Sequence, residues 1–269
     1  MWEGERMTEI IPLWDDLRLE ENGQNESAPS IQPYLLEGPR PFPVMIVAAG
    51  GAYARRAEHE AYPVAEWLNS IGISAVVLNY RVAPYKHPIP LSDAKRAIRM
   101  VRYKAIDWNL DPNKIGILGF SAGGHLASSA GIHFDFGNPV AEDPIERFSS
   151  RPDLMALCYP VLSMGEYTHE GSRLNLLGEK QEAELVELLS NENQITEESP
   201  PAFLWHTADD ASVPVENSLM FAAGLRRYKV PFDLHIFESG RHGLGLAEEH
   251  PEAREWPRLC ELWLRKQGF

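Results

Sequence analysis

The sequence predicts an α/β fold in which a doubly wound, mostly parallel sheet carries helices on both faces. Three observations support this prediction: short apolar runs bounded by turn residues, longer segments of helical periodicity between them, and a length of 269 residues of which 44% are hydrophobic. Strands that are apolar throughout need cover on both faces, and helices between them provide the crossovers of a parallel sheet. A chain of this size is expected to form one large domain or at most two small ones.

The elements follow in order along the chain from Pro43. Pro214 and Pro251 stand just before two of the helical segments, as expected at a helix start. The expected strands are Val44–Ala49, Ser74–Leu78, Ile115–Leu118, Leu154–Cys158, Ala202–Trp205 and Phe232–Phe237. The expected helices are Tyr62–Ser70, Ser92–Trp108, Glu182–Leu189, Val215–Tyr228 and Glu252–Lys266.

The first 43 residues lack this alternation. Five prolines between Ser27 and Pro43 favour an extended arm or an edge strand, because proline has no N–H to donate within a helix or sheet. We therefore expect an N-terminal arm, residues 1–43, packed on a catalytic domain of residues 44–269. The acidic N-terminus lacks a hydrophobic segment, so no signal peptide is expected.

Composition excludes several classes of function. A net charge of −14 and a pI near 5.1 disfavour binding to nucleic acid or anionic lipid. The apolar run that begins at Val44 is far shorter than the roughly 18 residues that span a bilayer. Two cysteines rule out a disulfide scaffold and a cysteine-rich zinc site. We expect a cytoplasmic enzyme or binding protein without a metal.

The segment Gly119-Phe120-Ser121-Ala122-Gly123 has the pattern Gly-x-Ser-x-Gly and follows an expected strand. Glycines two residues on either side of the serine let strand and helix approach closely around a strained turn that projects the hydroxyl. The helix start behind it favours negative charge. Structural turns use the same residues, but the position between a strand and a small-residue helix makes Ser121 the candidate nucleophile.

A serine nucleophile needs a general base and an acid that orients the base. In this fold both follow the serine, acid first, each on a loop after a later strand. His242 follows the strand Phe232–Phe237 and is the candidate base. Asp209 and Asp210 follow the strand Ala202–Trp205, and spacing alone does not choose between them as the acid.

An oxyanion intermediate also needs backbone N–H groups aimed at it. One is expected from Ala122, the residue after the nucleophile. The others are expected from Gly51 and Ala52, in the small-residue loop that follows the strand Val44–Ala49. A Gly-Gly pair also serves ordinary turns, but here it accompanies the other elements in the expected order.

Taken together, these motifs resemble the α/β-hydrolase esterases, and more narrowly the small bacterial acetyl esterases and acetylxylan-esterase-like proteins related to the hormone-sensitive-lipase group. The resemblance extends from about Ile11 to the end and is carried by residues 49–53, 78–84, 115–127, 205–210 and 240–243. It implies an α/β-hydrolase fold with a small or absent cap, Ser121 as nucleophile and His242 as base. Related members read His-Gly-x-x-Asp before a Val-Pro pair, which selects Asp210 as the acid.

The chain departs from these relatives in its oxyanion loop, which usually reads His-Gly-Gly-Gly or Pro-Gly-Gly-Gly. Here Ala49 takes the first position and Ala52 the last. Ala52 keeps a backbone N–H, so the site stays chemically complete, although an alanine at positive φ would be strained.

The resemblance implies a cofactor-free serine ester hydrolase that removes short acyl groups, such as acetyl, from acetylated carbohydrate or similar small esters. Only the arm and Ser163–Leu177 offer modest insertions, too small to hold long acyl chains. The polar stretch 164–173 is expected to overhang the site and suit a sugar-like alcohol, or to be an ordinary solvated loop. His125 and His206 are expected to pack. Candidate pocket residues, for which packing is an equal explanation, are Tyr53, His59, Tyr80 and His87.

Two other interpretations remain. A serine peptidase of the prolyl-oligopeptidase type carries a similar His-x-x-x-Asp loop, but it selects peptides with a large extra domain that 269 residues do not hold. A non-catalytic ligand-binding protein of this fold predicts loss of a triad member, and all three are present. The expected partner is a small-molecule ester, and the proline-rich arm leaves a homo-oligomer open.

Overall fold

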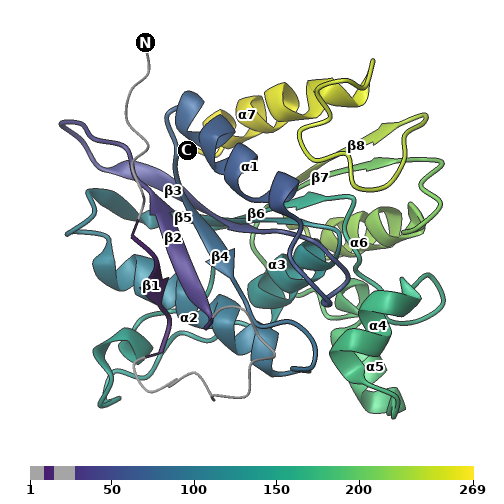
Figure 1. The fold of residues 1–269 in the computed structure, drawn as a ribbon, viewed down its shortest axis with the longest axis horizontal. Coiled ribbons are helices and arrows are strands. Elements are labelled where there is room, and N and C mark those ends of the chain that lie inside the picture. Colours follow the sequence, from purple (N-terminus) through teal and green to yellow (C-terminus); the bar gives the residue numbers. More distant parts are fainter. Residues whose placement is uncertain (1–8, 15–27) are drawn as a thin grey trace.

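An eight-stranded sheet forms the centre of the computed structural model, which describes residues 9–14 and 28–269 (Figure 1). Its strand order is β1-β2-β4-β3-β5-β6-β7-β8. Strands β3 to β8 run parallel, whereas β2 pairs antiparallel with β4 and β1 with β2. The strands are β1 (Ile11–Pro12), β2 (Ser30–Tyr34), β3 (Phe42–Ala48), β4 (Ser74–Asn79), β5 (Leu110–Phe120), β6 (Leu154–Cys158), β7 (Ala202–Thr207) and β8 (Phe232–Phe237). The predicted mostly parallel sheet is confirmed.

Helices cover both faces of the sheet. α2, α3 and α6 pack on one face, and α1 and α7 pack on the other (Figure 1). The α-helices are α1 (Tyr62–Ser70), α2 (Ile89–Lys104), α3 (Ala122–Ile132), α4 (Glu170–Leu177), α5 (Ala183–Leu189), α6 (Glu216–Arg227) and α7 (Trp256–Lys266). Short 3-10 helices are η1 (Glu58–Glu60), η2 (Pro144–Arg147), η3 (Asn191–Asn193) and η4 (Ala253–Glu255).

The wholly apolar strands are explained by two cores, one on each face of the sheet. In β3, Val44 and Ile46 belong to the core under α2 and α3, whereas Met45 and Val47 belong to the core under α1 and α7. Successive side chains of a strand point to opposite faces, so a doubly covered strand must be apolar at every position. In the second core, Trp256 of α7 stacks on Trp205 of β7, with ring centroids 5.3 Å apart.

Part of the predicted arm forms the edge of the sheet. β2 pairs with β4 from Ser30 opposite Asn79 to Tyr34 opposite Ala75. Pro33 lies within this edge region of the sheet, where a missing N–H is tolerated. The arm residues 1–8 and 15–27 lie outside the described residues. The expectation about a signal peptide concerns these residues and stays a prediction. The division at residue 43 stays a prediction.

Two helix starts differ from expectation by three residues or more, and both for the same reason. α2 begins at Ile89 rather than Ser92, and α7 begins at Trp256 rather than Glu252. Each has a proline in its first turn, where the N–H groups have no acceptor within the helix. The apolar periodicity located both helices, and the proline sets where each begins.

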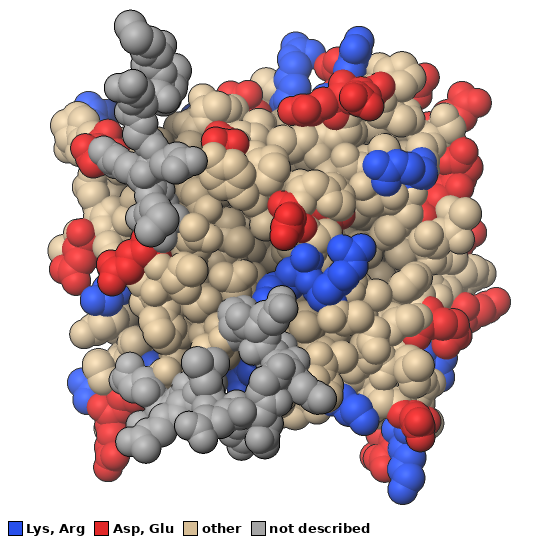
Figure 2. Space-filling view, in the orientation of Figure 1, with Lys and Arg blue, Asp and Glu red and all other residues tan. Residues whose placement is uncertain are grey.

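No helix within residues 9–14 and 28–269 combines the length and the apolar character needed to cross a bilayer. On the face shown in Figure 2, acidic and basic side chains of the described residues are interspersed. The expectation that the protein binds neither nucleic acid nor membrane remains a prediction.

Candidate active site

Ser121 occupies a sharp turn between β5 and α3. Its backbone has φ 50° and ψ −118°, a combination that most residues avoid. A Cβ added to Gly119 would lie 2.1 Å from the carbonyl oxygen of Gly123, and one added to Gly123 would lie 2.1 Å from that of Ala48. Glycine is therefore required on both sides of Ser121 for the strand and helix to come this close.

Ser121, His242 and Asp210 form one chain of hydrogen bonds. His242 Nε2 lies 2.8 Å from Ser121 Oγ, and His242 Nδ1 lies 2.6 Å from Asp210 Oδ2. An ionised carboxylate only accepts, so Nδ1 carries the proton and Nε2 is the acceptor that faces the serine hydroxyl. Asp209 instead accepts from the backbone N–H of Gly240, at 2.7 Å. The structure thus brings together the nucleophile, the base and the first-choice acid.

The Asp210 carboxylate has partners on both oxygens. Its Oδ1 accepts from the backbone N–H groups of Ser212 (2.8 Å) and Val213 (3.0 Å), and His206 Nε2 lies 3.5 Å from Oδ2. Burial raises the pKa of Asp210, but the interactions with His206, His242 and the Val213 N–H outweigh burial and hold the pKa well below its usual range. Asp210 therefore stays ionised across the working pH range.

His206 has a second role besides packing. It is fully buried, donates from Nε2 to the carbonyl oxygen of Val213 (3.0 Å) and is hydrogen-bonded at Nδ1 to the Ser218 hydroxyl (2.8 Å). The Nε2 N–H that donates to Val213 also faces Asp210. The four-residue spacing of His206 and Asp210 was the available sequence signal for this contact.

The expected oxyanion donors Gly51 and Ala52 are oriented by anchored carbonyls. In a trans peptide the N–H points opposite to the C=O of the same peptide group. The Gly50 carbonyl accepts from Ala57 N (2.9 Å), which directs the Gly51 N–H the other way. The Gly51 carbonyl accepts from Ala54 N (3.0 Å), which does the same for the Ala52 N–H.

The third expected donor, Ala122, is oriented in the same way. The Ser121 carbonyl accepts from Val161 N (3.0 Å), and Ala122 opens α3, where its N–H has no acceptor within the helix. The oxyanion loop lies directly against the nucleophile, since a Cβ added to Gly50 would lie 2.9 Å from Ser121 Cβ. Amides from two loops therefore flank Ser121.

Ala52 adopts φ 57°, the left-handed conformation in which an alanine is strained by roughly 1–2 kcal/mol. The side-chain amide of Asn175, on α4, donates to the Ala52 carbonyl oxygen at 2.8 Å. The surrounding structure therefore holds an alanine in a conformation that glycine adopts without strain.

Tyr53 and Tyr80 are core residues, so the expectation that they line a pocket is wrong. Their exposed fractions are 1% and 0%. The Tyr80 hydroxyl donates to the Ala49 carbonyl oxygen (2.7 Å), and the Tyr53 hydroxyl pairs with Nδ1 of His125 (2.8 Å). Their rings fill the core while their hydroxyls satisfy polar groups near the site. His125 packs its helix, as expected.

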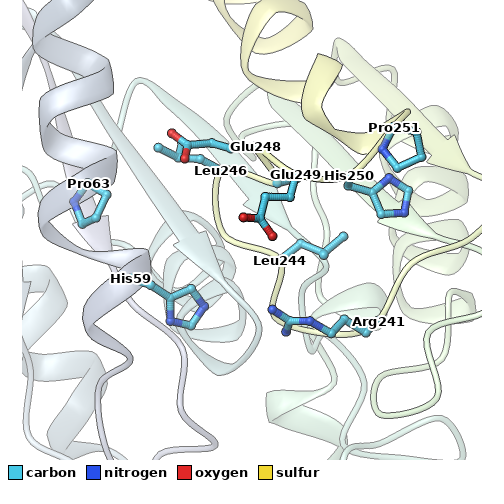
Figure 3. A pocket seen from close by; sticks show the side chains of 10 residues that line it. His59, Pro63, Arg241, Leu244, Leu246, Glu248, Glu249, His250 and Pro251 are labelled. Carbon is cyan, nitrogen blue, oxygen red and sulfur yellow. The ribbon is translucent and has the colours of Figure 1, made fainter.

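His59 lines a cavity of about 510 Å³ beside the His242 loop (Figure 3). The cavity is formed by His59 and Pro63 with residues of the segment 241–251, and Ser121 is not among its lining residues. The Nε2 of His59 and the guanidinium of Arg241 each lie 3.1 Å from the Gly243 carbonyl oxygen. His87 does not line this cavity. Its backbone N–H donates to the Leu176 carbonyl oxygen of α4 at 2.9 Å.

The polar stretch 164–173 was expected either to overhang the site or to be a solvated loop. It is helical from Glu170 onward, where α4 begins. The His169 side chain caps this helix, because its Nδ1 accepts the N–H of Ser172 at 3.1 Å. Histidine is not among the residues that usually mark a helix start, so the sequence carried no clear signal.

α4 lies beside the oxyanion loop. A Cβ added to Gly171 would lie 3.2 Å from His169 Cε1 and 3.9 Å from Ala52 Cβ. Burial lowers the pKa of His169, and the interaction with His242 lowers it further. His169 lies in the stretch 164–173 that was expected to overhang the site, but the sequence did not single it out.

The arrangement has the parts of an acyl-transfer site: a hydroxyl, a base, an acid and oriented amides. Within residues 9–14 and 28–269, no group of three or more histidine, cysteine, aspartate or glutamate side chains is arranged to hold a metal ion.

Comparison with known proteins gives matches that cover most of the chain. The BD-FAE family model matches residues 34–225. The structure of an acetyl ester-xyloside bifunctional hydrolase from Caldicellulosiruptor lactoaceticus is 55% identical, with a TM-score of 0.94 over 97% of both chains. The carboxylesterase Cest-2923 from Lactobacillus plantarum is 27% identical, with a TM-score of 0.75 over 91% of this chain and 96% of that chain.

Two curated relatives are longer than this chain. Endo-1,4-beta-xylanase B of Butyrivibrio fibrisolvens is 40% identical over 212 residues, 76% of this chain and 33% of that protein. An acetylxylan esterase of Xylanibacter ruminicola is 34% identical over 217 residues, 79% of this chain and 43% of that protein. The chain spans less than half the length of these two relatives.

Proposed function

The chain belongs to the BD-FAE family, and from that premise we propose that it is a serine carboxylic-ester hydrolase that removes acetyl and other short acyl groups from acetylated carbohydrates. The observation that carries the proposal is the hydrogen-bond chain of 2.8 and 2.6 Å from Ser121 through His242 to Asp210. It stands beside amides whose directions are fixed by anchored carbonyls. The chain shares its fold with the solved hydrolase and carboxylesterase compared above.

The proposed reaction is acyl transfer in two steps. Ser121 Oγ attacks the ester carbonyl while His242 Nε2 takes its proton, and Asp210 keeps the imidazole in the required tautomer. The N–H groups of Gly51, Ala52 and Ala122 stabilise the oxyanion. His242 then protonates the departing alcohol, and a water molecule activated by His242 releases the acyl group from the serine.

Two observations support acetylated carbohydrate as the substrate. The solved relative with 55% identity is described as an acetyl ester-xyloside hydrolase, and one curated relative is an acetylxylan esterase. In this chain, the polar start of α4 lies beside the oxyanion loop, at Gly171 and His169. Hydroxyl-rich alcohols need such polar partners, whereas long acyl chains need an apolar channel.

A cytoplasmic location is part of the proposal. Cys158 and Cys260 are buried free thiols, the form that a reducing compartment maintains. The partner proposed is a small-molecule ester.

The test is a series of p-nitrophenyl esters from acetate to decanoate, run on the wild type and on Ser121→Ala. We expect hydrolysis to be fastest with acetate and to disappear in the variant, and acetylated xylo-oligosaccharides to release acetate only with the wild type. A folded wild type that hydrolyses none of these esters, or a variant as active as the wild type, would contradict the proposal.

A further inference from the structure

Glu60 is a buried carboxylate that lies between two loops of the candidate site. The residue is 2% exposed and ends the 3-10 helix η1. Its Oε2 accepts from the backbone N–H of Gly50 at 2.7 Å, and its Oε1 accepts from the Tyr159 hydroxyl at 2.6 Å. A buried carboxylate is costly unless its oxygens are bonded, and here the bonds lead to the loops after β3 and β6.

The Gly50 contact fixes the peptide group that begins the oxyanion loop. The N–H of this peptide donates to Glu60, and its carbonyl, that of Ala49, accepts from the Tyr80 hydroxyl at 2.7 Å. The peptide is therefore held at both ends. A rotation of this group would be passed to Gly51, whose N–H is one of the proposed oxyanion donors.

The Tyr159 contact fixes the loop that carries His242. The backbone N–H of Gly245 lies 2.9 Å from the Tyr159 oxygen. An N–H can only donate, so the tyrosine oxygen accepts there and its single proton goes to Glu60. The Tyr159 ring also packs edge-on against His242, with centroids 5.0 Å apart. The Gly245 carbonyl in turn accepts from Trp256 Nε1 at 3.0 Å.

Glu60 is thus the common acceptor of two converging chains of donors. One runs from Gly245 through Tyr159, and the other comes directly from Gly50. A glutamine would offer one acceptor oxygen and place an NH₂ group against either the Gly50 N–H or the Tyr159 hydroxyl. A carboxylate is therefore required for both bonds to form at once, and bonds to an ionised acceptor are about twice as strong as neutral ones.

We propose that Glu60 is a positioning residue for ester hydrolysis: through Gly50 and Tyr159 it sets the oxyanion loop and the His242 loop relative to each other. It touches neither substrate nor reacting atoms. Transition-state stabilisation depends on donors placed within a few tenths of an ångström of the developing charge, so loss of this link lowers turnover more than substrate binding. This inference rests on the proposed function.

The test compares Glu60→Gln and Tyr159→Phe with the wild type in p-nitrophenyl acetate hydrolysis, with folding checked by circular dichroism. We expect kcat to fall about 10- to 100-fold in each variant while KM changes less than about threefold. The kcat of the double variant is expected to lie within about threefold of the kcat of the less active single variant, because both substitutions break the same chain of hydrogen bonds. The inhibition constant of a trifluoromethyl ketone, which mimics the oxyanion, is expected to rise in parallel with the loss in kcat.

Asp93→Asn is the matched control. Asp93 is also a buried carboxylate, but it binds Arg81 (2.6 Å) and Trp14 Nε1 (3.0 Å), and neither Gly50 nor Tyr159. The control is expected to lower the unfolding temperature and leave kcat unchanged. Wild-type kcat in both Glu60→Gln and Tyr159→Phe, multiplicative losses in the double variant, or an equal loss in Asp93→Asn would overturn the inference while the esterase proposal stands. An inactive wild type would instead overturn the esterase proposal and, with it, the inference.

Discussion

Asp209 and Asp210 are adjacent in the chain, yet they hold different parts of the loop after β8. Asp210 accepts from the imidazole of His242 at 2.6 Å, whereas Asp209 accepts from the backbone N–H of Gly240 at 2.7 Å. One carboxylate therefore fixes a side chain, and the other fixes the backbone two residues earlier. The consequences of losing them differ accordingly.

We expect Asp210→Asn to lower kcat/KM by about 10³- to 10⁴-fold, because an amide does not keep the imidazole in the acceptor tautomer. Asp209→Asn keeps an acceptor oxygen for Gly240 and is expected to cost less than about tenfold. Steady-state hydrolysis of p-nitrophenyl acetate measures both. The opposite order of effects would assign the acid to Asp209.

Gly51→Ala and Ala52→Gly test the departure in the oxyanion loop. Gly51 has φ 126°, and an added Cβ would lie 2.4 Å from the Arg55 carbonyl oxygen, so we expect Gly51→Ala to lower kcat at least about 100-fold. Ala52→Gly keeps the N–H and relieves the left-handed strain. Its kcat is expected within about threefold of the wild type, and a tenfold loss would show that the methyl group itself matters.

His169→Asn tests whether the start of α4 selects the alcohol part of the substrate. Asparagine keeps a side-chain cap for α4, but the Nε2 donor is lost. We expect kcat/KM to fall roughly 5- to 30-fold for acetylated xylo-oligosaccharides, the value of one hydrogen bond to a neutral group or somewhat more. Hydrolysis of p-nitrophenyl acetate should stay within about twofold. Equal losses with both substrates would mean that His169 acts on the reacting groups instead.

His125 predicts a pH dependence of stability. The ring is buried between the Tyr53 hydroxyl and the Leu189 carbonyl (2.8 Å each), and burial lowers its pKa to about 4. An unfolded histidine has a pKa near 6.5, so between pH 6.5 and 4 the unfolded chain binds a proton that the folded chain does not. The free energy of unfolding should therefore fall as the pH falls through this range, by up to about 1.4 kcal/mol per pH unit.

Guanidinium chloride unfolding at pH 7, 6 and 5 measures this slope. His125→Gln should be less stable than the wild type at pH 7, because a buried hydrogen-bonded ring is lost. Its stability should also decline less steeply below pH 6.5. Parallel slopes for the two proteins would show that His125 does not titrate as its burial implies.

The sequence allowed prediction of those parts of the site whose residues stand at strand ends. Ser121, Asp210 and His242 each follow a predicted strand, and parallel strands bring their carboxyl ends to one edge of the sheet. The doubly covered sheet was predictable because central strands such as β3 and β6 are apolar at every position. These signals are local in the chain.

The supporting residues were not predictable from local signals. Glu60 stands in an acidic segment of the kind that is usually exposed to solvent. Its burial follows from its contacts with Gly50 and Tyr159, which lie 10 and 99 residues away along the chain. Tyr53 and Tyr80 suggested pocket residues because they flank functional loops, yet both are core residues. Which tyrosine faces the core depends on long-range packing that periodicity does not encode.

The parallel indole rings of Trp205 and Trp256 give this protein an internal optical reporter. Their planes are 15° apart, and Trp256 Nε1 is bonded to the Gly245 carbonyl in the loop that carries His242. Two stacked chromophores couple their excited states, and the coupling changes with small changes in their separation. Near-ultraviolet circular dichroism should therefore change when the histidine loop moves, without a substrate or a label.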